Sequence, residues 1–253
     1  MRIRLLPNKR IGRVIFFTEG LVDEPELLIH LFHEVLEYEA FWRDPREDNA
    51  LSFSSKKDPY SKVFIVPMPS SAIKNIPGNE EFLDAAYRRL QEFGLERNEA
   101  SVYYLFDRDP QSNKPEAVEE KISLLKSPLD NGAELPGALL LSYPCLQAFY
   151  CLAHDVNATF SSSEEAKKLA NSDRLAWLDE KSVLLAADNM LITMHTLRDK
   201  EFSLDELADY SKINEEIYRA EEELWNGKGN AYLALSLLGL ALLDLGVLEI
   251  CPD

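Results

Sequence analysis

Apolar segments alternate with amphipathic ones over the first 154 residues, and this alternation limits the fold more than any other feature. Four short runs rich in β-branched, aromatic or leucine side chains are typical of buried strands: 11–17, 62–68, 101–106 and 137–142. Segments with apolar residues three or four positions apart follow them and predict helices: 25–39, 79–93, 115–126 and the part of 143–155 that follows Pro144. Strands alternating with helices predict a parallel sheet with helices on its faces.

The strand signal fades after about residue 155, and the remaining sequence predicts helices. Their expected ranges are 163–171, 174–194, 203–224 and 230–248. We therefore expect an α/β fold with a parallel sheet of about four strands flanked by helices, followed by an all-helical C-terminal region. The expected domains are 1–158 and 159–253.

The net charge and the cysteine content limit which molecules the protein binds and in which cellular compartment it is expected. The net charge is −17, whereas a protein that grips nucleic acid unaided normally carries a basic face. Three cysteines do not form a disulfide framework, the N-terminus has no secretory signal, and Asp244 interrupts the apolar segment 231–250 before it reaches membrane-spanning length. We expect a cytoplasmic protein without membrane contact.

Acidic residues follow two of the predicted strands. The first strand is followed by Thr18-Glu19-Gly20 and the third by Asp107-Arg108-Asp109. Ligands of open parallel sheets bind outside the carboxyl ends of the strands, and strand periodicity sends Asp107 and Asp109 to the same side. Carboxylates gathered there form the oxygen site that Mg²⁺ or Mn²⁺ prefers. A turn would also use these residue types, and Arg108 either forms a salt bridge away from the acids or reaches back to a phosphate.

The order strand–Glu-Gly–helix, strand–helix, strand–Asp-x-Asp, strand resembles the Toprim domain of topoisomerases, bacterial primases and OLD-family nucleases. Glu19-Gly20 matches the first motif and Asp107-x-Asp109 the second. The segment EGLVDEPELL resembles the EGxxDE motif of OLD-type and RloB-like proteins, which places Asp23 and Glu24 in a second acidic element. The resemblance covers residues 11–154. It implies that Glu19, Asp107 and Asp109 are catalytic, and that these three with Asp23 bind Mg²⁺ or Mn²⁺.

The segment LLLSYPCLQAFYCLAHD resembles the Toprim subunits of two-gene phage-defence systems such as PARIS. This implies a nuclease that cleaves DNA or RNA, with host tRNA among its substrates, and that acts as a toxic effector under the control of an ATPase partner. A homodimer on activation is part of the same expectation.

One position departs from that pattern, because Gln147 stands where the resemblance implies Glu. The alternative is a non-catalytic regulatory or assembly subunit that docks a basic partner through its acidic C-terminal region. Residues 200–253 carry twelve acids against four bases, which suits such docking. The sequence fits a primase or topoisomerase fragment less well, since no zinc-finger spacing and no evident nucleophilic tyrosine domain are present.

Overall fold

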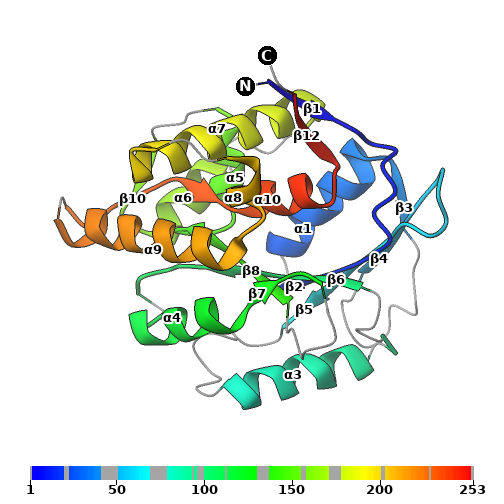
Figure 1. The fold of residues 1–253 in the computed structure, drawn as a ribbon, viewed down its shortest axis with the longest axis horizontal. Coiled ribbons are helices and arrows are strands. Elements are labelled where there is room, and N and C mark those ends of the chain that lie inside the picture. The colour runs from blue at the N-terminus through cyan, green and yellow to red at the C-terminus, as the bar shows by residue number, and fades with distance from the viewer. Residues whose placement is uncertain are drawn as a thin grey trace. The chain divides into compact units, whose positions relative to one another are not determined.

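The fold is described from a computed structural model of residues 1–253 (Figure 1). The described residues are 2–19, 23–40, 51–68, 79–92, 94–95, 100–111, 113–129, 137–154, 158–170, 178–200, 203–227 and 229–251.

The chain is an α/β protein with a mixed central sheet flanked by helices. The sheet order is β11-β8-β6-β2-β5-β4-β3, and β7 also pairs with β8. Its strands are β2 (Arg13–Thr18), β3 (Tyr38–Ala40), β4 (Leu51–Ser55), β5 (Lys62–Pro67), β6 (Ala100–Asp107), β7 (Lys126–Ser127), β8 (Gly137–Tyr143) and β11 (Leu235–Ser236). The four strands predicted from apolar runs are β2, β5, β6 and β8.

The central sheet is not the purely parallel sheet that we expected. Strand β2 pairs in parallel with β5 and β6, but β4 pairs antiparallel with β5, β3 with β4, and β11 and β7 with β8. Strand β4 lies in a polar segment that sequence analysis treated as a connection. Its serine-rich sequence LSFSS lacks the continuous apolar run of a buried strand, which is why it was missed.

Contacts divide the chain into two compact units. The core unit comprises 7–105 and 114–139, and the C-terminal unit comprises 1–6, 106–113 and 140–253. Strands β6 and β8 contribute residues to both. The predicted boundary between residues 158 and 159 stays a prediction.

The core unit is built on the three parallel strands β5, β2 and β6. The register pairs Phe16 with Tyr103 and Phe17 with Tyr104, and both pairs of rings stack, with centroids 5.3 and 4.7 Å apart. Aromatic pairs across strands stabilise a sheet beyond the area that they bury. The helical elements of this unit are α1 (Asp23–Ile29), the π-helix η1 (His30–Val35), α3 (Asn79–Glu92) and α4 (Pro115–Leu124).

The C-terminal unit is not all-helical. Its helices are α5 (Ala148–Leu152), α6 (Ser163–Ala170), α7 (Glu180–Arg198), α8 (Leu204–Leu207), α9 (Tyr210–Gly227) and α10 (Leu238–Asp244). Its further strands are β1 (Arg2–Leu5), β9 (Thr159–Phe160), β10 (Tyr232–Leu233) and β12 (Leu248–Cys251).

The predicted helix 230–248 is wrong over most of its length, because β10, β11 and α10 occupy it. Most of the segment is apolar and buried, and such a run does not distinguish a helix from strands. No described helix is both long enough and apolar enough to cross a membrane.

Candidate functional site

Asp107 ends strand β6 and is held firmly by the backbone around it. The residue is 9% exposed, and its Oδ1 accepts a hydrogen bond of 2.8 Å from the amide of Leu146. Its carbonyl oxygen accepts one of 2.8 Å from Nδ2 of Asn113. The carboxylate is therefore fixed in orientation at the strand end.

The segment after Asp107 continues alongside the end of β8. The amide of Arg108 donates to the carbonyl of Ser142 at 2.8 Å, and that of Asp109 donates to the carbonyl of Pro144 at 3.0 Å. Pro144 follows a cis peptide bond. These bonds bring the Asp-Arg-Asp sequence next to the turn that precedes α5.

Asp109 is the more open of the two aspartates. It is partly exposed, its Oδ1 accepts a hydrogen bond of 3.3 Å from the amide of Gln111, and its carbonyl accepts one of 2.9 Å from the amide of Asn113. An aspartate that bonds the amide two residues later forms an Asx turn. A carboxylate held at one oxygen and open to solvent is suited to bind a cation.

Gln147 lies at the N-cap of α5, in the same turn as Leu146. It is 7% exposed, and among the described residues its Oε1 has no hydrogen-bond partner. Leaving a buried amide oxygen unpaired is costly, so such an atom is a candidate ligand for water or a cation. An amide oxygen carries no formal charge, and it therefore replaces only part of what a glutamate would supply there.

The side chain of Arg108 points to α9. Of the two alternatives raised by the sequence, a salt bridge or a contact with phosphate, the structure shows the salt bridge. The Arg108 side chain is 2% exposed, and Nε lies 2.7 Å from Oε1 of Glu222. Burial opposes the charge, but the hydrogen bond to Glu222 and the nearby tyrosines Tyr218 and Tyr232 outweigh it, so the pKa of Arg108 is raised.

Glu221 is a further buried acid, and its position was not predicted from the sequence. It is fully buried on α9, its Oε2 accepts a hydrogen bond of 3.1 Å from the amide of Leu233, and among the described residues its Oε1 has no partner. The spacing of Ile213, Ile217 and Glu221 along α9 places Glu221 on the buried stripe, which was the available signal.

Glu19 and Asp23 belong to the core unit, whereas Asp107 and Asp109 belong to the C-terminal unit. Glu19 directly follows β2 and is partly exposed, and Asp23 opens α1 and is exposed. Gly20, the second residue of the Glu-Gly motif, lies outside the described residues. Within the described ranges, no group of three or more His, Cys, Asp or Glu side chains is arranged to hold a metal ion.

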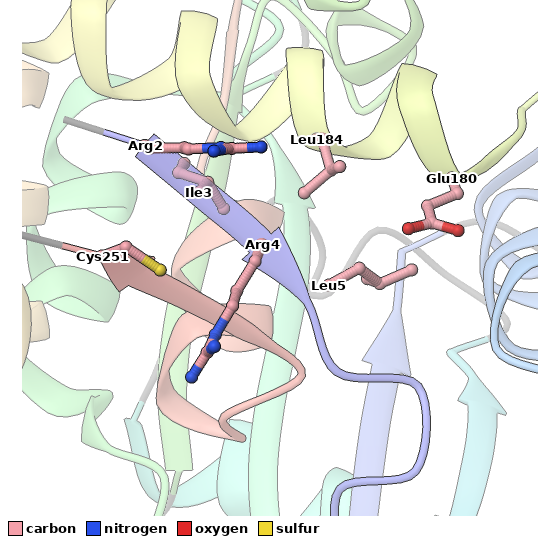
Figure 2. A pocket seen from close by; sticks show the side chains of 7 residues that line it. All are labelled: Arg2, Ile3, Arg4, Leu5, Glu180, Leu184 and Cys251. Atoms are coloured by element: carbon pink, nitrogen blue, oxygen red, sulfur yellow. The ribbon is translucent and has the colours of Figure 1, made fainter.

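A cavity of about 610 Å³ lies elsewhere in the C-terminal unit, between β1, the end of β12 and the start of α7 (Figure 2). Arg2, Arg4, Glu180 and Cys251 supply its polar lining, with apolar side chains between them. Arg4 is paired with Glu249, and Arg2 and Glu180 carry opposite charges. None of the predicted acids lines this cavity.

The chain matches no known protein family, no curated protein and no solved structure.

Proposed function

We propose that the chain is a Mg²⁺- or Mn²⁺-dependent nuclease of the Toprim type that cleaves phosphodiester bonds of DNA or RNA. One observation carries the proposal: β2 and β6 are adjacent parallel strands, β2 is followed by Glu19, and β6 ends at Asp107, which is followed by Arg108 and Asp109. The register pairs Thr18 with Leu105, so both strands finish at the same edge of the sheet. Ligands of parallel sheets bind at that edge.

The proposed roles follow from the chemistry of carboxylates. Asp107 and Asp109 bind the metal ion, Glu19 binds metal or acts as general base, and Asp23 is a secondary ligand. When bound by these residues, such an ion would supply polarisation of a phosphate oxygen and a more acidic water as the nucleophile. Two observations support these roles. The carboxylate of Asp107 is held in one orientation, and the carboxylate of Asp109 is accessible from solvent.

The biological role that we propose is a toxic effector of phage defence controlled by an ATPase partner. Its support is the resemblance of the segment LLLSYPCLQAFYCLAHD, residues 139–155, to the Toprim subunits of two-gene systems, together with the net charge of −17. An acidic chain repels nucleic acid, so activity is expected to depend on metal or on a partner.

The test is induced expression in a bacterial host of the wild type, Glu19→Ala, Asp109→Asn and the control Glu26→Ala, with and without the neighbouring gene. Glu26 is an exposed acid on α1 with no proposed role. We expect growth arrest and fragmentation of one class of nucleic acid with the wild type and the control. Equal growth of all four strains under phage challenge would contradict the nuclease.

A non-catalytic assembly subunit is the second candidate, and Gln147 is the observation that favours it, because an amide replaces the acid that the resemblance implies. In that case Glu19→Ala leaves function intact. Deleting the C-terminal region is not a clean test of docking, since β12 pairs with β1 and β11 with β8. Charge reversal at the exposed Glu215 and Glu223 of α9 tests docking without removing strands.

A further inference from the structure

The Asp107–Asp109 segment is connected to helix α9 through one buried ion pair. The Arg108 guanidinium donates from Nε to Oε1 of Glu222 at 2.7 Å and from Nη1 to the carbonyl of Asn113 at 2.9 Å. The same Glu222 oxygen accepts a hydrogen bond of 2.7 Å from the hydroxyl of Tyr232. Glu222 therefore fixes the guanidinium from the side of α9.

Asn113 links Arg108 to both aspartates through hydrogen bonds. Its Nδ2 donates to the carbonyl of Asp107 at 2.8 Å, and its amide donates to the carbonyl of Asp109 at 2.9 Å. Glu222, Arg108 and Asn113 thus form a continuous series of hydrogen bonds that ends on the two residues proposed to hold metal.

Because Arg108 is buried, the hydrogen bonds that join Glu222, Arg108 and Asn113 depend on the charge of Glu222. The guanidinium is almost completely buried and lies 5.6 and 5.9 Å from the rings of Tyr218 and Tyr232. A buried cation without its counter-ion is strongly unfavourable, so loss of the Glu222 charge drives the guanidinium to move toward solvent. Because Arg108 lies between the two aspartates, that movement displaces both.

We propose that Arg108 is a positioning residue that sets the geometry of Asp107 and Asp109, and that Glu222 on α9 holds it in place. The proposal deepens the proposed function and rests on it: the metal site depends on α9, a helix more than one hundred residues away in sequence. A partner that displaces α9 would thereby alter the site.

The test compares the full-length wild type with Glu222→Gln, Arg108→Lys and Glu215→Gln. Glu215 provides a matched control because it is an exposed glutamate on the same helix that pairs with Arg219, one turn away. Binding of Mn²⁺ alone is measured by electron paramagnetic resonance, and amide hydrogen exchange is followed over residues 107–113. Cleavage is measured on the nucleic-acid class that the expression experiment identifies.

We expect Glu222→Gln to weaken Mn²⁺ binding and to lower kcat roughly tenfold or more, as for other partners that orient metal ligands, with KM for nucleic acid unchanged. Exchange at the amides of Arg108, Asp109 and Asn113 should accelerate, while exchange in α7 keeps the wild-type rate. Arg108→Lys retains the charge but not the two-point contact, so an intermediate effect is expected. Glu215→Gln should match the wild type.

Two results would overturn the positioning role while leaving the nuclease in place: Glu222→Gln behaving like Glu215→Gln, or exchange accelerating equally throughout the C-terminal unit. A wild type that neither binds Mn²⁺ nor cleaves nucleic acid contradicts the proposed function itself, and the positioning role is then withdrawn with it.

Discussion

Glu221 shows how burial alters the chemistry of one side chain. The carboxyl group is enclosed beneath α9, and burial raises its pKa well above the usual 4.5, with the neighbouring charge of Glu222 acting in the same direction. The hydrogen bond from the amide of Leu233 offsets only part of this effect. The group therefore favours its neutral form in the folded protein.

A raised pKa makes the stability of the folded protein depend on pH. The stabilisation is fully present below about pH 4.5, the ordinary value, and is lost as the pH rises toward the folded-state pKa. Glu221→Gln is neutral throughout, so its stability relative to the wild type should improve by up to about 1.4 kcal/mol per pH unit in that window.

Urea unfolding at a series of pH values from 4.5 upward measures this difference. Glu223→Gln, which removes an exposed carboxylate from the same helix, is the control for the loss of one acid. A constant offset between Glu221→Gln and the wild type at every pH would show that Glu221 keeps the same protonation when it folds.

Two cysteines are predicted to be unreactive in the native protein. Burial raises the pKa of Cys145, with the charge of Asp107 adding to it, and burial raises the pKa of Cys151 to about 12. Since the thiolate is the reactive form, iodoacetamide at about pH 8 should label Cys251, which is partly exposed, well before the other two. Peptide mass spectrometry follows the order of labelling. Unfolding in urea should remove the difference, and early labelling of Cys145 in native protein would contradict its burial.

At the level of elements, strand β8 begins at a position that accepts only glycine. Gly137 has φ of +119°, and a Cβ there would lie 2.8 Å from Cε2 of Tyr104 and 2.9 Å from both Cγ1 and the carbonyl of Val102. The backbone of Val102 cannot move without disturbing β6. Gly137→Ala should therefore lower the free energy of unfolding by roughly 2 kcal/mol or more.

Gly12→Ala is the matched control for Gly137→Ala. Gly12 also has a positive φ, +67°, but a Cβ there would meet nothing within 4 Å. Its cost should be limited to backbone strain, about 1 kcal/mol. Denaturant unfolding compares the two, and equal losses would mean that the contacts with Tyr104 and Val102 are relieved by small movements.

At the scale of the whole molecule, the net charge bears on the nucleic-acid substrate that we propose. The net charge of −17 over 253 residues opposes the approach of phosphates, so under the proposed function a bound metal ion would help to bring the two together. We expect weak binding of labelled RNA hairpins and DNA duplexes at about 0.15 M salt, strengthened by Mg²⁺.

Fluorescence anisotropy with and without Mg²⁺ checks this expectation. Asp109→Asn should lose the part of the affinity that depends on Mg²⁺, whereas Glu26→Ala should retain it. Binding that is equally strong in the presence of a chelator would place the contact on a basic patch instead.

Local pattern determined the central strands and the residues that follow them. The runs around β2, β5, β6 and β8 are apolar because both faces of each strand are buried, and this composition is visible without any partner. The acids at positions 19, 107 and 109 were located by the same reasoning, since a strand end is read from where its apolar run stops.

Only the tertiary structure decided which segments meet. Strand β1 was invisible because its partner, β12, lies at the other end of the chain, and a four-residue strand with alternating burial has little signal of its own. The direction of Arg108 was open until Glu222 was found beside it. Strand pairing and buried ion pairs join residues far apart in sequence, and their free energy depends on a desolvated environment that the folded chain creates. The periodicity of apolar residues records only whether a position is buried. It does not identify the strand or charged residue with which that position pairs.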